Sequence, residues 1–240
     1  IYFARKNSSL LQLGKTHLDV RVIVKTCVNG SSELMTNLSS SIVNSLFNIQ
    51  LMKFAGENGV AAYGTIMYVS FVFVSIFLGY SIGSAPLISY NYGARRPARV
   101  RKAGVVLAMM MILYTGVMWS VIILEPGALI RIFSTDAELM QDAMTALNQY
   151  FAAFIFMDFQ YMGQTVFKSL NKKKQAVFFS LLRKVFIVVP LTYFMPYVLH
   201  MGTSGVFLAE PVSNVIGGSL CFITMLCMIL PELKRMEVPA

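Results

Sequence analysis

The sequence predicts an all-α polytopic membrane protein, a bundle of six transmembrane helices. Of its 240 residues, 56% are hydrophobic and only 13% are charged, whereas a soluble domain carries about 25% charged residues. Three uncharged runs, at 58–94, 103–124 and 185–209, each exceed the roughly 18 residues that indicate a membrane span. Lys and Arg gather between these runs, as they do in membrane proteins.

The first span is expected at 26–52, and it ends in the short segment KFAGENG at 53–59, which is rich in helix breakers. The remaining spans are expected at 60–88, 103–124, 143–167, 176–199 and 205–230.

The bundle therefore occupies 26–231. Residues 1–25 are interpreted as the end of a preceding helix and a cytoplasmic connection, and 232–240 as a cytoplasmic tail. The chain starts at Ile1 with neither Met nor a signal-peptide pattern, so we expect an internal start within a longer protein.

The basic residues follow the expected topology. Of the 20 Lys and Arg residues, all but Lys53 and Arg131 fall on or near the side that holds both termini. The positive-inside rule places this side in the cytoplasm. The bundle is expected in the cell inner (plasma) membrane. The net charge of +9 then serves topology, and no nucleic-acid partner is expected.

A stripe of polar side chains runs along one face of the first span. Asn37, Ser41, Asn44 and Asn48 recur at helical spacing on one face. The opposite face carries Leu34, Leu38, Ile42, Leu46 and Ile49. Because amides find no hydrogen-bond partners in lipid, the polar stripe is predicted to face other helices or a water-filled cavity. Interhelical hydrogen bonding is the commoner use of such residues, but a whole row indicates a cavity that holds a substrate.

Three carboxylates lie inside predicted spans: Glu33, Asp158 and Glu210. A charge at the bilayer centre costs about 2.5–3.5 kcal/mol, so each must line water, bind a cation, pair with a base or stay protonated. Asp158 is the deepest, with Tyr161 on the same face, and we predict that it couples to a cation. Glu33 is a second candidate, although it lies close enough to the cytoplasmic end to reach interfacial water.

Structural or gating roles are predicted for residues in the last two spans, 176–199 and 205–230. Glu210 is expected close to the outer end of its span, next to Pro211. Pro190 is a candidate bend, because proline removes a helical hydrogen bond. Arg183 and Lys184 are interpreted as residues that reach the cytoplasmic interface.

An enzyme is not indicated. The sequence has no His-Glu-x-x-His, Gly-x-Ser-x-Gly or P-loop pattern, so no catalytic residue, bound metal or cofactor is expected. A channel stays open as an alternative because a polar stripe also suits a pore, although no filter-like sequence is present.

Several segments resemble one transporter family. These are GVAAY at 59–63, GYSIGSAP at 79–86 and YNYGA at 90–94, followed by shorter matches at 180–183 and 209–211. In order and spacing they resemble the C-terminal half of multidrug and toxic compound extrusion (MATE) transporters, and the resemblance covers about 26–231.

The resemblance implies one lobe of a twelve-helix transporter, with an N-terminal six-helix half as its partner. It implies export of small cationic, amphipathic drugs across the lipid bilayer in exchange for Na⁺ or H⁺, by alternating access. Part of the family binds the cation with acids in its seventh and tenth helices. Asp158 falls beside the tenth-helix position, whereas the seventh-helix position falls near Ser41, two turns from Glu33.

Two other functions are kept open. One is a lipid-linked oligosaccharide flippase of related architecture, and the other is a channel or a non-transporting membrane scaffold. A flippase cavity is expected to be basic, because its headgroups are anionic. The acids inside the predicted spans instead favour cationic cargo.

Overall fold

The structure, a computed structural model, describes residues 19–133 and 136–237. These residues form helices joined by short turns, and no strand occurs among them. The elements are α1 (Val20–Gly93), α2 (Pro97–Leu124), α3 (Pro126–Arg131), α4 (Ala137–Tyr150), α5 (Phe154–Ser169), α6 (Lys173–Leu181), η2 (Leu182–Val188), α7 (Val189–Tyr193), η3 (Phe194–Val198), α8 (Gly202–Ser213), η4 (Asn214–Gly218) and α9 (Ser219–Glu237), where η marks a π-helical turn.

Within this part of the chain, four helices are long and apolar enough to cross a membrane. They are Leu34–Gly93, Pro97–Leu124, Lys173–Val198 and Gly202–Glu237. The predicted all-α membrane fold is confirmed, while the count of six spans stays a prediction.

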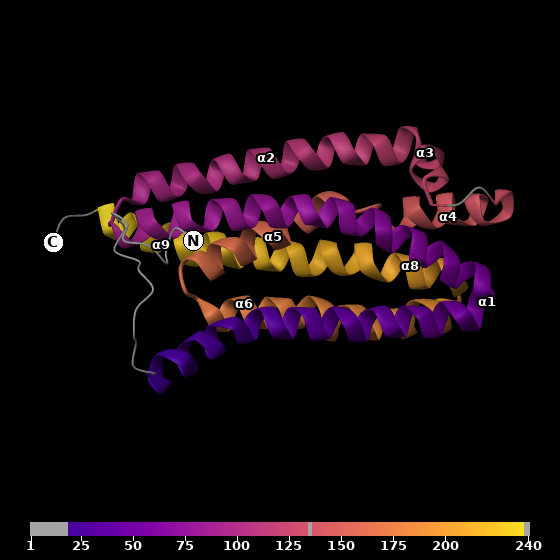
Figure 1. Cartoon of the computed structure of the whole chain (residues 1–240), viewed down its shortest axis with the longest axis horizontal. Helices are drawn as coiled ribbons and strands as arrows, with labels where there is room; N and C mark the ends of the chain where they lie inside the picture. The colour runs from indigo at the N-terminus through magenta and orange to yellow at the C-terminus, as the bar shows by residue number, and fades with distance from the viewer. Residues whose placement is uncertain (1–18, 134–135, 238–240) are drawn as a thin grey trace, which may run out of the picture. The chain divides into compact units, whose positions relative to one another are not determined.

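The first of these helices doubles back on itself at one glycine. Gly56 has φ 63° and ψ −152°, a conformation that is open almost only to glycine. Figure 1 shows the two parts of α1 running in opposite directions from this bend. We call residues 34–55 the first limb and 57–93 the second limb. The predicted turn at 53–59 is therefore present, but it interrupts the helix at a single residue.

The N-terminal end of α1 belongs to a separate compact unit that extends to Ser31. Within that unit the helix begins at Val20, because the Asp19 carboxylate accepts hydrogen bonds from the backbone N–H groups of Arg21 (2.9 Å) and Val22 (3.3 Å). An aspartate that caps the first turn in this way stabilises a helix start. Helix thus begins before the predicted position 26, and residues 1–18 of the predicted connection lie outside the described residues.

The connection between the predicted spans 60–88 and 103–124 is much shorter than the 14 residues, 89–102, that those spans leave for it. The second limb continues to Gly93, and α2 begins at Pro97, a residue suited to the first position of a helix. Arg95 makes the turn between them with φ 52°.

The predicted fourth span, 143–167, is interrupted. It falls on α4 and α5, which are separated at residues 151–153. Short turn hydrogen bonds, such as that from the Phe154 N–H to the Phe151 carbonyl (3.1 Å), replace the regular helical ladder there.

Helix α5 packs against α2, η4 and α9, and glycines allow the close approach. A Cβ on Gly163 would lie 2.6 Å from the Cys221 Sγ, and one on Gly218 would overlap the backbone carbonyl oxygen of Phe156. Small residues at such contacts are the usual means by which membrane helices pack closely.

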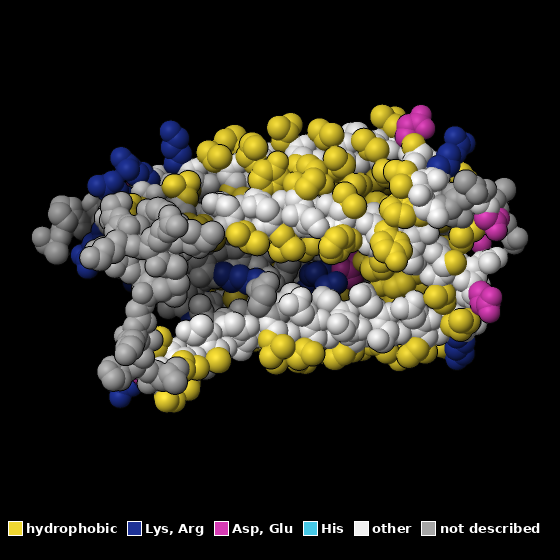
Figure 2. Space-filling model, viewed as in Figure 1, with side chains coloured by type: hydrophobic (Ala, Val, Ile, Leu, Met, Phe, Trp, Pro, Cys, Tyr) yellow, Lys and Arg dark blue, Asp and Glu magenta, His cyan; other side chains and the backbone are white. Residues whose placement is uncertain are grey.

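The outer surface matches a membrane environment. Large apolar side chains such as Phe71 (72% exposed) and Leu113 (67% exposed) face outward from α1 and α2. Figure 2 shows these hydrophobic surfaces along the helices, with most charged side chains at the two ends.

Candidate functional site

The carboxyl group of Asp158 is enclosed in the bundle. Asp158 lies on α5 and is 0% exposed. Its Oδ1 accepts a hydrogen bond of 2.7 Å from the Thr115 hydroxyl on α2, and its Oδ2 has no hydrogen-bond partner among the described residues. A buried carboxylate with one neutral donor is poorly compensated, so this oxygen is suited to a proton or a metal cation.

Aromatic rings lie on the same side of α5 as this acid. Phe154 and Tyr161 are one turn before and after Asp158, and both rings approach Phe77 of the second limb, at centroid distances of 5.6 and 5.4 Å. Tyr114 of α2 meets Phe77 edge-on at 5.4 Å. The predicted cavity residue Tyr161 is therefore part of an aromatic cluster near Asp158.

The polar stripe of the first limb stays uncovered by the rest of the described bundle. Asn37, Ser41, Asn44 and Asn48 are all exposed. Asn44 Oδ1 accepts a hydrogen bond of 3.0 Å from the hydroxyl of Tyr63, which anchors the stripe to the second limb.

The apolar face of this limb is also exposed, as at Leu38 (49%) and Ile42 (55%). The limb packs into the bundle through a third face, with Ser39, Val43 and Phe47 at most 3% exposed. The two faces that the sequence predicts as opposite therefore flank a packing face that the polar pattern did not reveal.

A charged cluster links η2, α8 and η4. The Arg183 guanidinium Nη1 lies 2.8 Å from Glu210 Oε1 and donates to Asn214 Oδ1 at 2.7 Å. The Lys184 ammonium donates to the same Glu210 oxygen at 3.0 Å. The exposed fractions of the Arg183, Lys184 and Glu210 side chains are 8%, 15% and 4%. We call these residues with Asn214 the Glu210 cluster.

This cluster corrects two interpretations of the sequence. Arg183 and Lys184 do not reach an interface, because they are turned inward onto Glu210. The charges inside the spans are not all acidic either, because the cluster holds two cations for one anion. The signal available in the sequence was Glu210 itself, since a buried carboxylate calls for a basic partner on a neighbouring helix.

The predicted gating residues lie next to π-helical turns. Pro190 sits in α7 between η2 and η3, and Pro211 in α8 precedes η4. π-turns and prolines are the usual origins of helix bends. For the second cation candidate, Glu33, the backbone is helical, but its side chain lies outside the described part of the structure.

Sequence reasoning did not identify Thr115 or Asn214 as partners. Neither belongs to a local motif, and each meets its partner only across the packed helices.

A protein-family model described as MatE matches residues 34–194. A curated FAD transporter from Shewanella oneidensis is 21% identical over 185 residues, which are 76% of this chain and 40% of that protein.

Solved structures share the fold. One is described as a crystal structure of MATE in complex with MaL6, with TM-score 0.86, 16% identity, and coverage of 95% of this chain and 52% of that one. Another is an outward-facing multidrug resistance MATE family transporter of the MOP superfamily, with TM-score 0.81, 18% identity, and coverage of 95% and 51%. A third is a Pyrococcus furiosus MOP superfamily transporter described as having a binding pocket of reverse polarity, with TM-score 0.82, 19% identity, and coverage of 90% and 49%. The chain spans about half the length of these structures.

Proposed function

This chain belongs to the MatE family of membrane transporters, and on that premise we propose that it forms the C-terminal six-helix lobe of a secondary active exporter. The exporter exchanges Na⁺ or H⁺ for an amphipathic organic compound. The partner in this proposal is an N-terminal six-helix half, and the 52% coverage of a matched transporter structure supports such an arrangement.

One observation carries the proposed ion coupling, namely the buried carboxyl group of Asp158. Its Oδ1 is held by Thr115 and its Oδ2 has no partner in the described structure. An uncompensated charge at this depth is costly, and a bound cation offsets the cost. The protein then binds the cation in one state and releases it when the site opens to water on the other side.

The cavity wall in this proposal is the exposed polar stripe of the first limb. Lipid offers no hydrogen-bond partners to these polar side chains. In this proposal they therefore face the space between the two lobes; the residues are Asn37, Ser41, Asn44 and Asn48. The aromatic cluster around Phe77 offers apolar contact for amphipathic cargo.

Movement between inward and outward states follows from rocking of one lobe against the other. Pro190 and Pro211, each next to a π-turn, provide positions at which α7 and α8 bend. Glu210 fixes the position of α8 relative to η2 through Arg183 and Lys184.

Two cargo classes follow from two different observations. The carboxyl group of Asp158 favours small cationic drugs, as the sequence predicts. The Glu210 cluster carries one excess positive charge and favours an anionic compound, and the relative named as an FAD transporter supports this second candidate. A lipid-linked oligosaccharide flippase would use the same basic cluster, whereas a channel would need no exchange.

The test is transport by the purified full-length protein in vesicles, with an imposed Na⁺ or H⁺ gradient, using ethidium as the cationic cargo and FAD as the anionic one. Asp158→Asn keeps the shape and the Thr115 contact but removes the charge, so we expect gradient-driven transport to be lost. Asp142→Asn is the matched control, since Asp142 is an exposed acid on α4.

Transport that survives in folded Asp158→Asn protein would overturn the role of this acid. Flux of either cargo without any gradient dependence would identify a channel, and movement of neither cargo would favour the flippase.

A further inference from the structure

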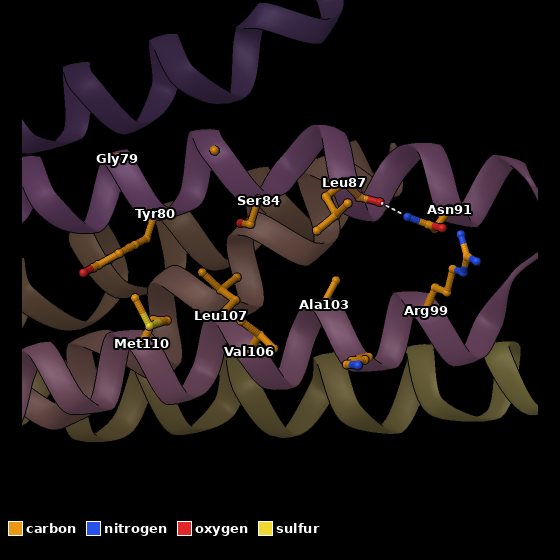
Figure 3. Close-up of a pocket in the computed structure, with 12 residues that line it drawn as sticks. Gly79, Tyr80, Ser84, Leu87, Asn91, Arg99, Ala103, Val106, Leu107 and Met110 are labelled. Atoms are coloured by element: carbon orange, nitrogen blue, oxygen red, sulfur yellow. Dashed lines mark hydrogen bonds between the residues drawn. The ribbon is translucent and has the colours of Figure 1, made fainter.

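The second limb of α1 and the first half of α2 line a pocket of about 600 Å³, open to the surface, that the proposed transport cycle does not use. Figure 3 shows its elongated form, with Tyr80 and Met110 at one end and Asn91 and Arg99 at the other. Most of its wall is apolar, and neither Asp158 nor the polar stripe lines it. We call it the α1–α2 pocket.

One end of the pocket is basic and uncompensated. Arg99 and Lys102 both line it, and neither has a carboxylate partner among the residues that the structure describes. Arg101, on the same turn, is instead paired with Glu237 at 3.3 Å. Two free cations beside an apolar wall indicate an occupant with an anionic group at one end only.

The same end offers an unused hydrogen-bond acceptor. Asn91 lines the pocket and is only 6% exposed. Its amide nitrogen donates to the Leu87 carbonyl at 2.8 Å, while its Oδ1 has no partner within the described residues. A buried amide oxygen of this kind calls for a donor, such as a hydroxyl group of an occupant.

The other part of the pocket is an open groove between the two helices. A Cβ built on Gly79 or Gly83 meets no heavy atom within 4 Å. These two glycines form the floor of the groove, and no side chain fills the space above them. At a rise of about 1.5 Å per residue, the stretch from Gly79 to Asn91 is roughly 18 Å long. This is about one leaflet of a hydrocarbon core of roughly 30 Å.

We propose that the α1–α2 pocket binds one anionic glycerophospholipid with a hydroxylated headgroup, of the phosphatidylglycerol type. Its phosphate pairs with Arg99 and Lys102, a headgroup hydroxyl donates to Asn91 Oδ1, and an acyl chain lies over Gly79 and Gly83. Such a lipid satisfies the free cations, the unpaired acceptor and the apolar wall together. A zwitterionic choline lipid has no hydroxyl donor and no net charge.

Native mass spectrometry of the purified full-length protein tests this directly. After removal of bound lipid, the protein is titrated with phosphatidylglycerol or phosphatidylcholine. We expect one phosphatidylglycerol to bind at least about tenfold more tightly than phosphatidylcholine, because both cations face the anionic group. Equal binding of the two lipids would overturn the proposed headgroup chemistry.

Two variants locate the site, and each has a matched control. Gly83→Leu fills the floor and should abolish the bound phosphatidylglycerol, whereas Gly116→Leu, also in open space on a helix, should not. Arg99→Gln with Lys102→Gln should weaken binding about tenfold or more, whereas Arg101→Gln should leave it unchanged.

Folding is checked by a monodisperse elution profile, and the charge variants decide the question if Gly83→Leu does not fold. Full lipid retention by folded Gly83→Leu, or by the double charge variant, would place the lipid elsewhere and overturn the proposal.

Discussion

Arg183 and Glu210 form an ion pair of 2.8 Å inside the bundle, between the π-turn η2 and helix α8. Lys184 adds a second cation to the same carboxylate oxygen at 3.0 Å. The pair therefore joins two consecutive helices at a point where the backbone is already irregular. With Lys184 included, the Glu210 cluster carries one excess positive charge inside the bundle.

Charge counting predicts how this cluster responds to substitution. Glu210→Gln leaves two buried cations without an anion, and breaking a buried pair in this way costs about 3–5 kcal/mol. Lys184→Gln leaves the neutral Arg183–Glu210 pair intact, so we expect a much smaller loss. The thermal unfolding midpoints of the purified protein in detergent compare the two variants, and equal losses would show that the cluster does not act through charge balance.

A second prediction concerns the one hydrogen bond that Asp158 makes. Thr115→Val keeps the shape of the side chain but leaves a buried carboxyl group with no donor, at a cost of about 1–3 kcal/mol in stability. Thr192→Val is the matched control, because Thr192 is also fully buried but donates to the Val188 carbonyl four residues earlier in the chain. Thermal unfolding should separate the two, and the cost of Thr115→Val should shrink when Asp158 is already Asn.

A third prediction concerns close helix packing. An alanine Cβ at Gly218 would overlap the Phe156 carbonyl, which belongs to the rigid backbone of α5. We expect Gly218→Ala to separate η4 from α5 and to cost about 1–3 kcal/mol, as overpacking does. Gly116→Ala, where the new methyl group meets nothing within 4 Å, should be neutral or slightly stabilising. A Gly218→Ala protein with the wild-type unfolding midpoint would contradict the packing argument.

The sequence was sufficient for the fold class and for the burial of Asp158 inside the bundle, while the role of this acid stays a prediction. Uncharged runs such as 103–124 can only be buried in a core or in lipid, and a lone Asp158 in such surroundings indicates function. The position of the polar stripe also followed from helical spacing.

Hydrogen-bond partners on different helices could not be predicted from the sequence. Thr115 is 43 residues from Asp158, and no local pattern links them. Arg183 was misplaced because its partner Glu210 is 27 residues away, so no local pattern shows that its side chain turns inward. The short link between α1 and α2 was predicted as a long loop because five basic residues lie within 89–102. Three of them, Arg99, Arg101 and Lys102, lie within α2 instead.

The last prediction concerns the bend that gives α1 its two limbs. Gly56 has φ 63° and ψ −152°, so any side chain there adds backbone strain of about 1–3 kcal/mol. We expect Gly56→Ala to lower the unfolding midpoint and to favour a straighter helix that pulls the first limb away from the bundle. Gly64→Ala is the matched control, because Gly64 lies within a regular part of the same helix with nothing within 4 Å of a new Cβ. Alanine is favoured over glycine by about 1 kcal/mol in a helix interior, so this control should stabilise the protein. If both variants stabilise it to the same extent, the bend does not depend on the conformation of Gly56, and the contact between Tyr63 and Asn44 would have to hold the limbs together instead.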